Sequence, residues 1–256
     1  MCRCCPSIPP LPGRRDVHRL LLAAALAPAG LAAPEARADD HVAPRLHLAA
    51  APAGRARVAL TLDACAGAAD MRVLGGLMRL GVRATVFVTA RWLRANPGTV
   101  ALLRERQDLF ALQNHGERHV AAVLGAGRLF GQPVAGTLEG VRREVEGGAA
   151  AIVAAGAPAP GWYRGATALY SPAALAEIRG MGLRVAGFSV NADQGASLPA
   201  AQVARRIAAA RDGDVIIAHT NRPDRPSGPG VVEGAAMLQA RGTAFAWLDG
   251  EAMVEA

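Results

Sequence analysis

The fold class follows from residues 57–88, which read RVALTLDACAGAADMRVLGGLMRLGVRATVFV. Two short apolar runs, 57–62 and 84–88, flank a segment of helical period at 69–80. A strand, a helix and a second strand form a βαβ unit, which is the building block of parallel sheets. Strands that are apolar along their whole length are typical of a sheet covered on both faces. The stretch therefore predicts an α/β fold built on a parallel sheet.

The same alternation of short apolar runs and helical segments continues to the end of the chain. Five further strands are predicted at 109–112, 162–164, 183–190, 215–218 and 244–248, which brings their number to seven. Five further helices are predicted at 97–106, 138–155, 172–180, 200–210 and 231–240. Seven such strands indicate either an open doubly wound sheet or a barrel. The 256 residues suit a single domain, since one α/β barrel reaches about 250 residues.

The composition is that of an ordinary globular protein, with 52% hydrophobic and 19% charged residues. It argues against a disordered, collagen-like or polytopic membrane protein. The formal net charge is +7, and the 28 basic residues are all arginines. No run of arginines is longer than a pair such as Arg142-Arg143, so the charge is scattered and does not form a nucleic-acid-binding patch. We expect no nucleic-acid partner.

The first forty residues have the pattern of an export signal. Arg14-Arg15 precedes an apolar stretch at 20–33, and Ala36-Arg37-Ala38 supplies the small residues that a signal peptidase prefers. The apolar stretch is too short to span about 30 Å of hydrocarbon as a stable anchor. The arginine pair is typical of the twin-arginine route, with general secretion as the alternative. We expect a periplasmic or extracellular protein that has no transmembrane anchor after cleavage.

Cleavage after Ala38 divides the chain into a signal peptide at 1–38, a linker at 39–54 and a catalytic domain at 55–256. Three of the four cysteines lie in the signal peptide, so only Cys65 remains. A single cysteine cannot form an internal disulfide in an oxidising compartment. We expect Cys65 to be buried.

Polar residues that could take part in catalysis or bind a metal follow the predicted strands. The carboxyl ends of parallel strands meet at one rim, where the active sites of such folds lie. Of the five histidines beyond residue 38, the three outside the linker all fall at strand ends, which favours a metal or acid/base site over isolated structural histidines. The strand-end residues are Asp63, Asn114, His115, His119, Arg164, Asn191, Asp193 and His219.

Two of these histidines suggest a metal site by their spacing. His115 and His119 are four residues apart, which on a helical turn brings both imidazoles to one side. Neutral imidazole is a good ligand for Zn²⁺ and similar cations, and a third ligand is usually a carboxylate or histidine from another strand end. Asp63 at a strand end is a candidate base or ligand. We expect Arg164 to form an ion pair with Asp193 that holds the base in position.

Five ordered motifs resemble those of the NodB-type polysaccharide deacetylases, and the resemblance runs from about Arg57 to Leu248. It implies a distorted (β/α) barrel of about seven parallel strands in a single domain, in agreement with the strand count. The motifs are Thr61-Leu62-Asp63-Ala64-Cys65, Asn114-His115-Gly116-Glu117-Arg118-His119, Tyr163-Arg164-Gly165-Ala166-Thr167, Ser189-Val190-Asn191-Ala192-Asp193 and Ile216-Ile217-Ala218-His219.

The resemblance implies that an acetyl group is removed from an N-acetylated sugar by metal-assisted hydrolysis. His115 and His119 would bind a divalent metal, for which zinc is our expectation. Asp63, near or on the metal, would take a proton from the attacking water, and His219 would protonate the leaving amine. These roles fit the chemistry of amide hydrolysis, in which a cation stabilises the developing charge, a base accepts the proton of water and an acid protonates the leaving group.

The remaining motif residues would support this chemistry. Arg164 would orient Asp63, and either Asp193 or Asn191 would support the acid and the base. We expect Asn114, Tyr163 and Asn191 to contact the substrate, which is an N-acetylated glycan or a related small amide.

The chain departs from the family pattern in three motifs. Ala64 stands where the family usually has a second aspartate, a metal ligand, so Asp63 moves onto the metal, or two histidines and water hold it, or the site is weak or empty. Ala166 and Thr167 replace a usual Pro-Tyr pair, and the fourth motif lacks its usual tryptophan. Two other functions stay open: hydrolysis of a small non-sugar amide, and a carbohydrate-binding relic without catalysis.

Overall fold

The computed structural model describes residues 41–49, 54–249, 251 and 253–255. The signal peptide expected at 1–38 lies outside the described residues. No helix in the described part of the chain is long and apolar enough to cross a membrane.

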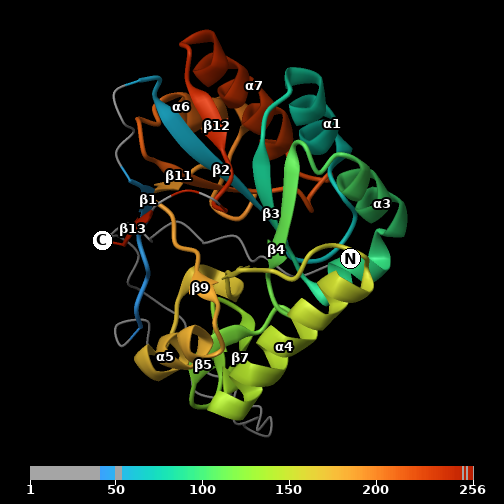
Figure 1. Ribbon diagram of the computed structural model, residues 1–256, viewed down its shortest axis with the longest axis vertical. Coiled ribbons are helices and arrows are strands. Elements are labelled where there is room, and N and C mark those ends of the chain that lie inside the picture. Colours follow the sequence, from blue (N-terminus) through green and yellow to red (C-terminus); the bar gives the residue numbers. More distant parts are fainter. Residues whose placement is uncertain (1–40, 50–53, 250, 252, 256) are drawn as a thin grey trace, which may run out of the picture.

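The centre of the fold is a sheet of eight strands in which every pairing is parallel (Figure 1). Seven strands follow the order β10-β11-β2-β3-β4-β8-β9 and curl into a half-barrel, while β12 pairs with the first half of β2. The expected distorted (β/α) barrel is confirmed. The strands are β2 (Arg57–Ala64), β3 (Ala84–Val88), β4 (Phe110–Asn114), β8 (Trp162–Tyr163), β9 (Arg184–Val185), β10 (Val190–Asn191), β11 (Val215–His219) and β12 (Ala244–Ala246).

Strand β2 lies at the middle of the sheet and separates two environments. Its side chains alternate between the two faces, as the period of a strand requires. Leu60, Leu62 and Ala64 pack into the largest apolar cluster, together with side chains of the surrounding helices. Ala59 joins a second cluster on the opposite face, which is the inner face of the half-barrel. The apolar sequence of β2 therefore reflects burial on both faces.

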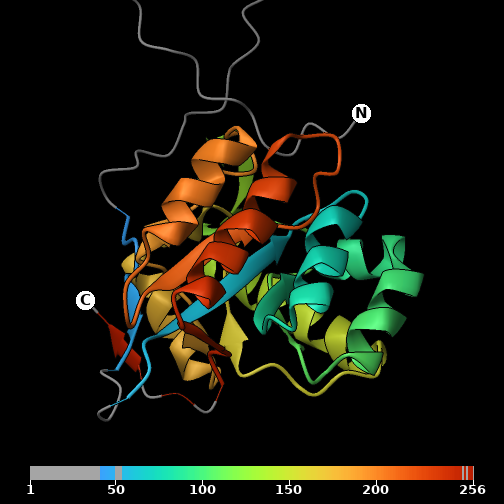
Figure 2. The same ribbon diagram turned by 90° about the horizontal axis from the view of Figure 1, so that it is seen from above.

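Helices cover the outer face of the sheet, and the predicted ones all form. Asp70 caps α1 by accepting a hydrogen bond from the backbone N–H of Arg72, and Gly81 ends it in the left-handed conformation. Helices α6 and α7 lie side by side over the sheet (Figure 2). The short helix α2 was not predicted. The helices are α1 (Met71–Leu80), α2 (Ala90–Ala95), α3 (Pro97–Glu105), α4 (Leu138–Ala154), α5 (Pro172–Gly180), α6 (Ala200–Ala208) and α7 (Ser227–Ala240), with a 3₁₀ turn η2 (Ala166–Ala168).

The strand predicted at 183–190 is instead two short strands, β9 and β10. The chain between them leaves the sheet ladder, and the carbonyls of Ala186 and Gly187 turn toward the side chain of Arg164. A side chain at Gly187 would collide with the backbone of Pro44, so this segment also needs glycine.

Two pieces of β structure lie outside the main sheet. The expected linker contains β1 (Leu46–Leu48), which pairs antiparallel with β13 (Met253–Glu255). Leu46 and Leu48 are buried against the inner cluster, so part of this stretch packs onto the domain. A three-stranded sheet of β5 (Ala121–Leu124), β6 (Arg128–Leu129) and β7 (Gln132–Gly136) interrupts the βα alternation between β4 and α4.

Candidate active site

The carboxyl ends of the parallel strands bring the predicted residues to one pocket of about 530 Å³. Asp63 is the last residue but one of β2 and His219 is the last residue of β11, and the two are direct neighbours in the parallel register. His115 follows β4 directly, and His119 lies four residues further along the same loop. All four line the pocket, together with Cys65. The convergence expected from strand ends is therefore present.

Asp63 is held by a completely buried arginine. Arg164 Nη1 donates hydrogen bonds of 2.8 Å both to Asp63 Oδ1 and to Thr61 Oγ1. Arg164 Nε and Nη2 donate to the carbonyls of Ala186 and Gly187, at 3.2 and 3.1 Å. The guanidinium thus has partners on every side, which is what burial of a charge requires.

This environment keeps the Asp63 carboxylate ionised. Burial alone would raise the pKa of Asp63, but the positive charge of Arg164, with smaller contributions from His115 and His219, holds it below its ordinary value. Because Arg164 occupies Oδ1, the second oxygen, Oδ2, is the one available for proton transfer; it lies 3.7 Å from His115 Nε2.

His219 is paired with Asp193, and the expected ion pair between Arg164 and Asp193 is wrong. Asp193 is fully buried and accepts from His219 Nδ1 at 2.9 Å and from the His219 backbone N–H at 2.7 Å. This leaves His219 Nε2 for the pocket. Burial favours the neutral ring, but the charge and hydrogen bond of Asp193 raise the pKa of His219 above its ordinary value. Asp193 therefore contacts His219, whereas Arg164 contacts Asp63.

His115 and His119 face each other across 4.9 Å between ring centroids. His115 Nδ1 donates to the carbonyl of Arg164 at 2.6 Å, and His119 Nδ1 donates to Gln132 Oε1 at 3.1 Å. These bonds place the ring proton on Nδ1, so each Nε2 has a lone pair that can bind a metal. Cys65 Sγ lies 3.5 Å from His115 Nε2. Burial lowers the pKa of His115, and it lowers the pKa of His119 to about 3, so both rings are neutral.

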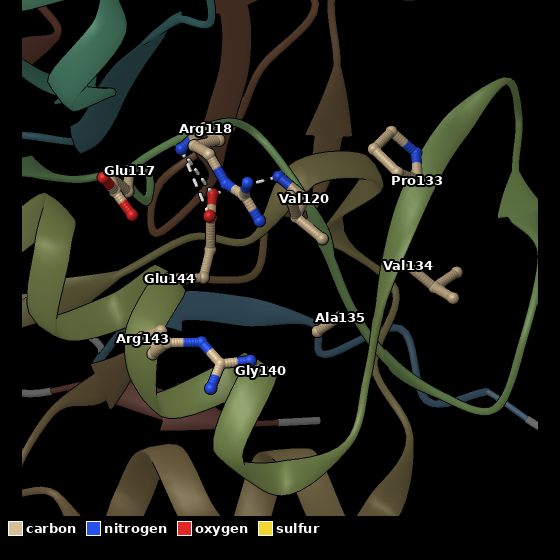
Figure 3. A pocket seen from close by; sticks show the side chains of 9 residues that line it. All are labelled: Glu117, Arg118, Val120, Pro133, Val134, Ala135, Gly140, Arg143 and Glu144. Carbon is tan, nitrogen blue, oxygen red and sulfur yellow. Dashed lines mark hydrogen bonds between the residues drawn. The ribbon is translucent and has the colours of Figure 1, made fainter.

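The spacing of His115 and His119 predicted a helical turn, but this prediction is wrong. Residues 115–120 form a loop, and His119 has a φ of 66°, in the left-handed region. The loop is held by buried Glu144 of α4, whose carboxylate accepts from the backbone N–H groups of Arg118 and Val120 at 3.0 Å (Figure 3). At Gly116, φ is 91° and a side chain would collide with Glu144. The position of the two histidines is therefore fixed by hydrogen bonds to the buried Glu144 carboxylate and not by a helical turn.

The cluster that suits a metal contains a cysteine. The ligand atoms of Cys65, His115 and His119 all lie within 4.8 Å of one another, and all three residues are buried. Among the described residues this is the one group of three or more ligand-type side chains this close together, and Asp63 is not part of it. Nitrogen and sulfur donors fit a borderline cation such as Zn²⁺.

The predicted substrate-binding residues divide into two groups. Asn191 lines the pocket, and its Oδ1 accepts from the backbone N–H of Gln194. Asn114 is fully buried, and its amide donates to the Val145 carbonyl and accepts from the backbone of Gly116. Tyr163 is fully buried in an apolar cluster. Asn114 and Tyr163 do not line the pocket in this structure, and substrate contact by them stays a prediction.

Several pocket residues were not predicted from the sequence. Phe130 and Gln132 come from the β6–β7 hairpin, and Phe188 from the bend between β9 and β10. Phe130 is 53% exposed. These positions depend on contacts between distant segments, which a local pattern does not reveal. Cys65 could have been found, because it directly follows the carboxyl end of β2, where the other pocket residues gather.

Comparison with known proteins gives a family match. Residues 50–186 match the family model described as polysaccharide deacetylase. No protein of the curated set matches the chain at a significant level.

Among solved structures, a family 4 carbohydrate esterase from Streptomyces lividans in complex with acetate is 21% identical, with a TM-score of 0.61 over 77% of this chain and 96% of that one. The peptidoglycan deacetylase PdaC from Bacillus subtilis is 18% identical, with a TM-score of 0.62 over 77% and 90%. A family 4 pseudoenzyme from Bacillus anthracis is 14% identical, with a TM-score of 0.62 over 76% and 64%. At these identities the similarity shows the fold.

Proposed function

The chain belongs to the polysaccharide deacetylase family of hydrolases, and on that premise we propose that it is a metal-dependent enzyme that removes N-acetyl groups from an envelope glycan. The observation that carries the proposal is the meeting of Asp63, His115, His119 and His219 on one pocket. An ionised carboxylate, a histidine with a raised pKa and two neutral imidazoles are the groups that metal-assisted amide hydrolysis requires.

The two neutral histidines are the proposed metal ligands. Their Nδ1 hydrogen bonds fix the orientation of each ring and direct Nε2 away from the protein backbone. A divalent cation bound there supplies Lewis acidity, which lowers the pKa of water and stabilises the negative charge that develops on the amide oxygen. Zinc is the metal that we propose for this donor set.

Asp63 is the proposed general base. It takes a proton from the water whose oxygen attacks the carbonyl carbon, and Oδ2 is the oxygen free to do so. Arg164 holds the carboxylate in place through Oδ1, so the base enters the reaction already oriented.

His219 is the proposed general acid. It donates its Nε2 proton to the leaving nitrogen as the C–N bond breaks, which releases acetate and a free amine. Asp193 holds Nδ1 and stabilises the protonated ring before that step. Base and acid lie on neighbouring strands, so both reach the same pocket.

The pocket surroundings favour a sugar-sized substrate. Phe130 offers a half-exposed ring at the rim, and Asn191 offers a polar side chain. We propose that residues 1–38 direct export, so that the enzyme meets glycans of the cell envelope. The Ala166 and Thr167 replacements keep a small non-sugar amide as the second candidate substrate, since Thr167 lines the pocket.

The substrate proposal is tested by measuring acetate release from chitin oligomers, peptidoglycan fragments and a panel of small acetamides. We expect metal-loaded protein to release acetate from at least one of the two glycans. Release from the small acetamides alone would support the second candidate substrate. No release from any compound, by folded protein that contains metal, would contradict the enzymatic proposal and favour a binding relic.

The pairing of His219 with Asp193 predicts a pH effect. Activity requires protonated His219, so it should fall as the pH rises through the pKa of that group. In Asp193→Asn the negative charge that raises this pKa is gone, so the alkaline limb of the kcat profile should move to lower pH. Asp108→Asn removes an exposed carboxylate that does not line the pocket. It is the matched control and should leave the profile unchanged. An unmoved alkaline limb in Asp193→Asn would show that His219 is not the acid.

A further inference from the structure

The missing aspartate of the first motif has a replacement in the structure. We propose that the Cys65 thiolate is the third protein ligand of the metal, in place of a carboxylate at position 64. The inference rests on the proposed function, because it assumes that His115 and His119 bind a metal, and it adds the identity of the remaining ligand and the preference for one class of cation.

The path of β2 explains why position 65 takes this role. Leu60, Leu62 and Ala64 point to the helix-covered face, where Ala64 is completely buried in the large apolar cluster. Thr61 and Asp63 point to the opposite face, where both contact Arg164. Cys65 follows the last residue of β2 directly, and its side chain lines the same pocket as that of Asp63. Ala64 has no donor atom and packs in the apolar cluster, whereas the sulfur of Cys65 lies beside the two histidines.

The distances also suit a metal. Cys65 Sγ lies 3.5 Å from His115 Nε2. Tetrahedral Zn²⁺ with Zn–S of about 2.3 Å and Zn–N of about 2.05 Å places a sulfur and a nitrogen about 3.5 Å apart. The carbonyl of Cys65 accepts a hydrogen bond of 2.6 Å from Thr89 Oγ1, which fixes the backbone at this point. The spacing of Cys65 and His115 therefore already suits a shared cation, and the ligand atoms of all three residues lie within 4.8 Å of one another.

The ligand type determines which cation the site prefers. A thiolate with two imidazoles favours Zn²⁺ and Co²⁺, whereas a carboxylate in the same place would accept the harder Mn²⁺ and Mg²⁺ more readily. The thiol proton passes to solvent as the metal binds. We expect the protein to select Zn²⁺ over Mg²⁺, and Cys65→Asp to shift the selectivity toward Mn²⁺.

The test uses full-length protein in which Cys2, Cys4 and Cys5 are replaced by serine, so that Cys65 is the one thiol. Metal-free protein is titrated with Co²⁺, and the ultraviolet and visible spectra are recorded. A thiolate ligand produces a sulfur-to-cobalt charge-transfer band in the near ultraviolet, which imidazole and carboxylate ligands do not. We expect this band in the parent protein and its absence from Cys65→Ser, with Co²⁺ affinity at least about tenfold weaker in that variant.

The controls separate this inference from the proposed function. His115→Ala should lose both the band and tight Co²⁺ binding, and thermal unfolding of the metal-free variants shows whether each one folds. Tight Co²⁺ binding without the band, and with equal affinity in Cys65→Ser, would overturn the cysteine ligand and leave the histidine site intact. No Co²⁺ binding by the folded parent protein would overturn both the inference and the metal-dependent function on which it rests.

Discussion

Asparagine in place of Asp63 is expected to lower kcat for acetate release by about 10²- to 10⁴-fold, because the variant has no carboxylate to accept the proton of the attacking water. The loss should fall on kcat more than on KM, since Oδ2 serves proton transfer rather than glycan binding. The measurement is steady-state acetate release by protein with a known metal content.

Stability must be measured beside activity, because Asp63 is also the counter-charge of buried Arg164. Removing one partner of a buried ion pair costs about 3–5 kcal/mol, although the amide oxygen of the introduced asparagine can still accept a hydrogen bond from the guanidinium. Rates are therefore compared well below the unfolding temperature of the variant, with Asp108→Asn as the matched control of unchanged activity. Asp63→Asn with kcat within about tenfold of the parent enzyme would show that another group is the base.

The second large effect is expected at the histidine pair. His115→Ala and His119→Ala should each weaken metal binding by at least about 100-fold and abolish acetate release, because each removes one ligand nitrogen from the proposed metal site. The check is metal bound per chain after dialysis against a chelator of known affinity. His47→Ala removes a histidine outside the pocket and should retain the metal. Unchanged metal content in both pocket variants would refute the proposed ligands.

The fold could be predicted from the sequence because its signals are local. The 57–88 stretch contains its own strand, helix and strand, and the alternation of apolar runs with helical segments repeats it along the chain. The carboxyl-end rule predicts that Asp63, His115 and His219 lie at one rim. Parallel pairing makes Asp63 and His219 direct neighbours and puts His115 at the same rim, two strands from Asp63, which is why this part of the site was predictable.

The parts that sequence reasoning missed depend on contacts between distant segments. The 115–120 loop takes its shape from Glu144, which is more than twenty residues away, so a spacing of four was interpreted as a helical turn. The sequence offers two strand-end carboxylates, Asp63 and Asp193, as partners of Arg164. The three-dimensional arrangement shows that Arg164 binds Asp63 and that Asp193 binds His219.

Motif membership did not distinguish residues that face the pocket from residues that support it. Asn114 and Tyr163 lie in the motifs, yet both are buried on the structural side, while Cys65 was expected only to be buried. Cys65 is buried, and its side chain is also next to the proposed ligand His115. Its place directly after the carboxyl end of β2 is the local signal for a pocket position.

The central claim, a metal-dependent hydrolytic centre at the mouth of the half-barrel, is tested most directly by adding Zn²⁺ to metal-stripped parent protein while acetate release from chitin oligomers or peptidoglycan fragments is followed. Activity should be absent at the start, rise in proportion to added metal and reach its plateau at one equivalent per chain. Acetate release that is equally fast before any metal is added, or that never appears although one equivalent is bound, would contradict the account.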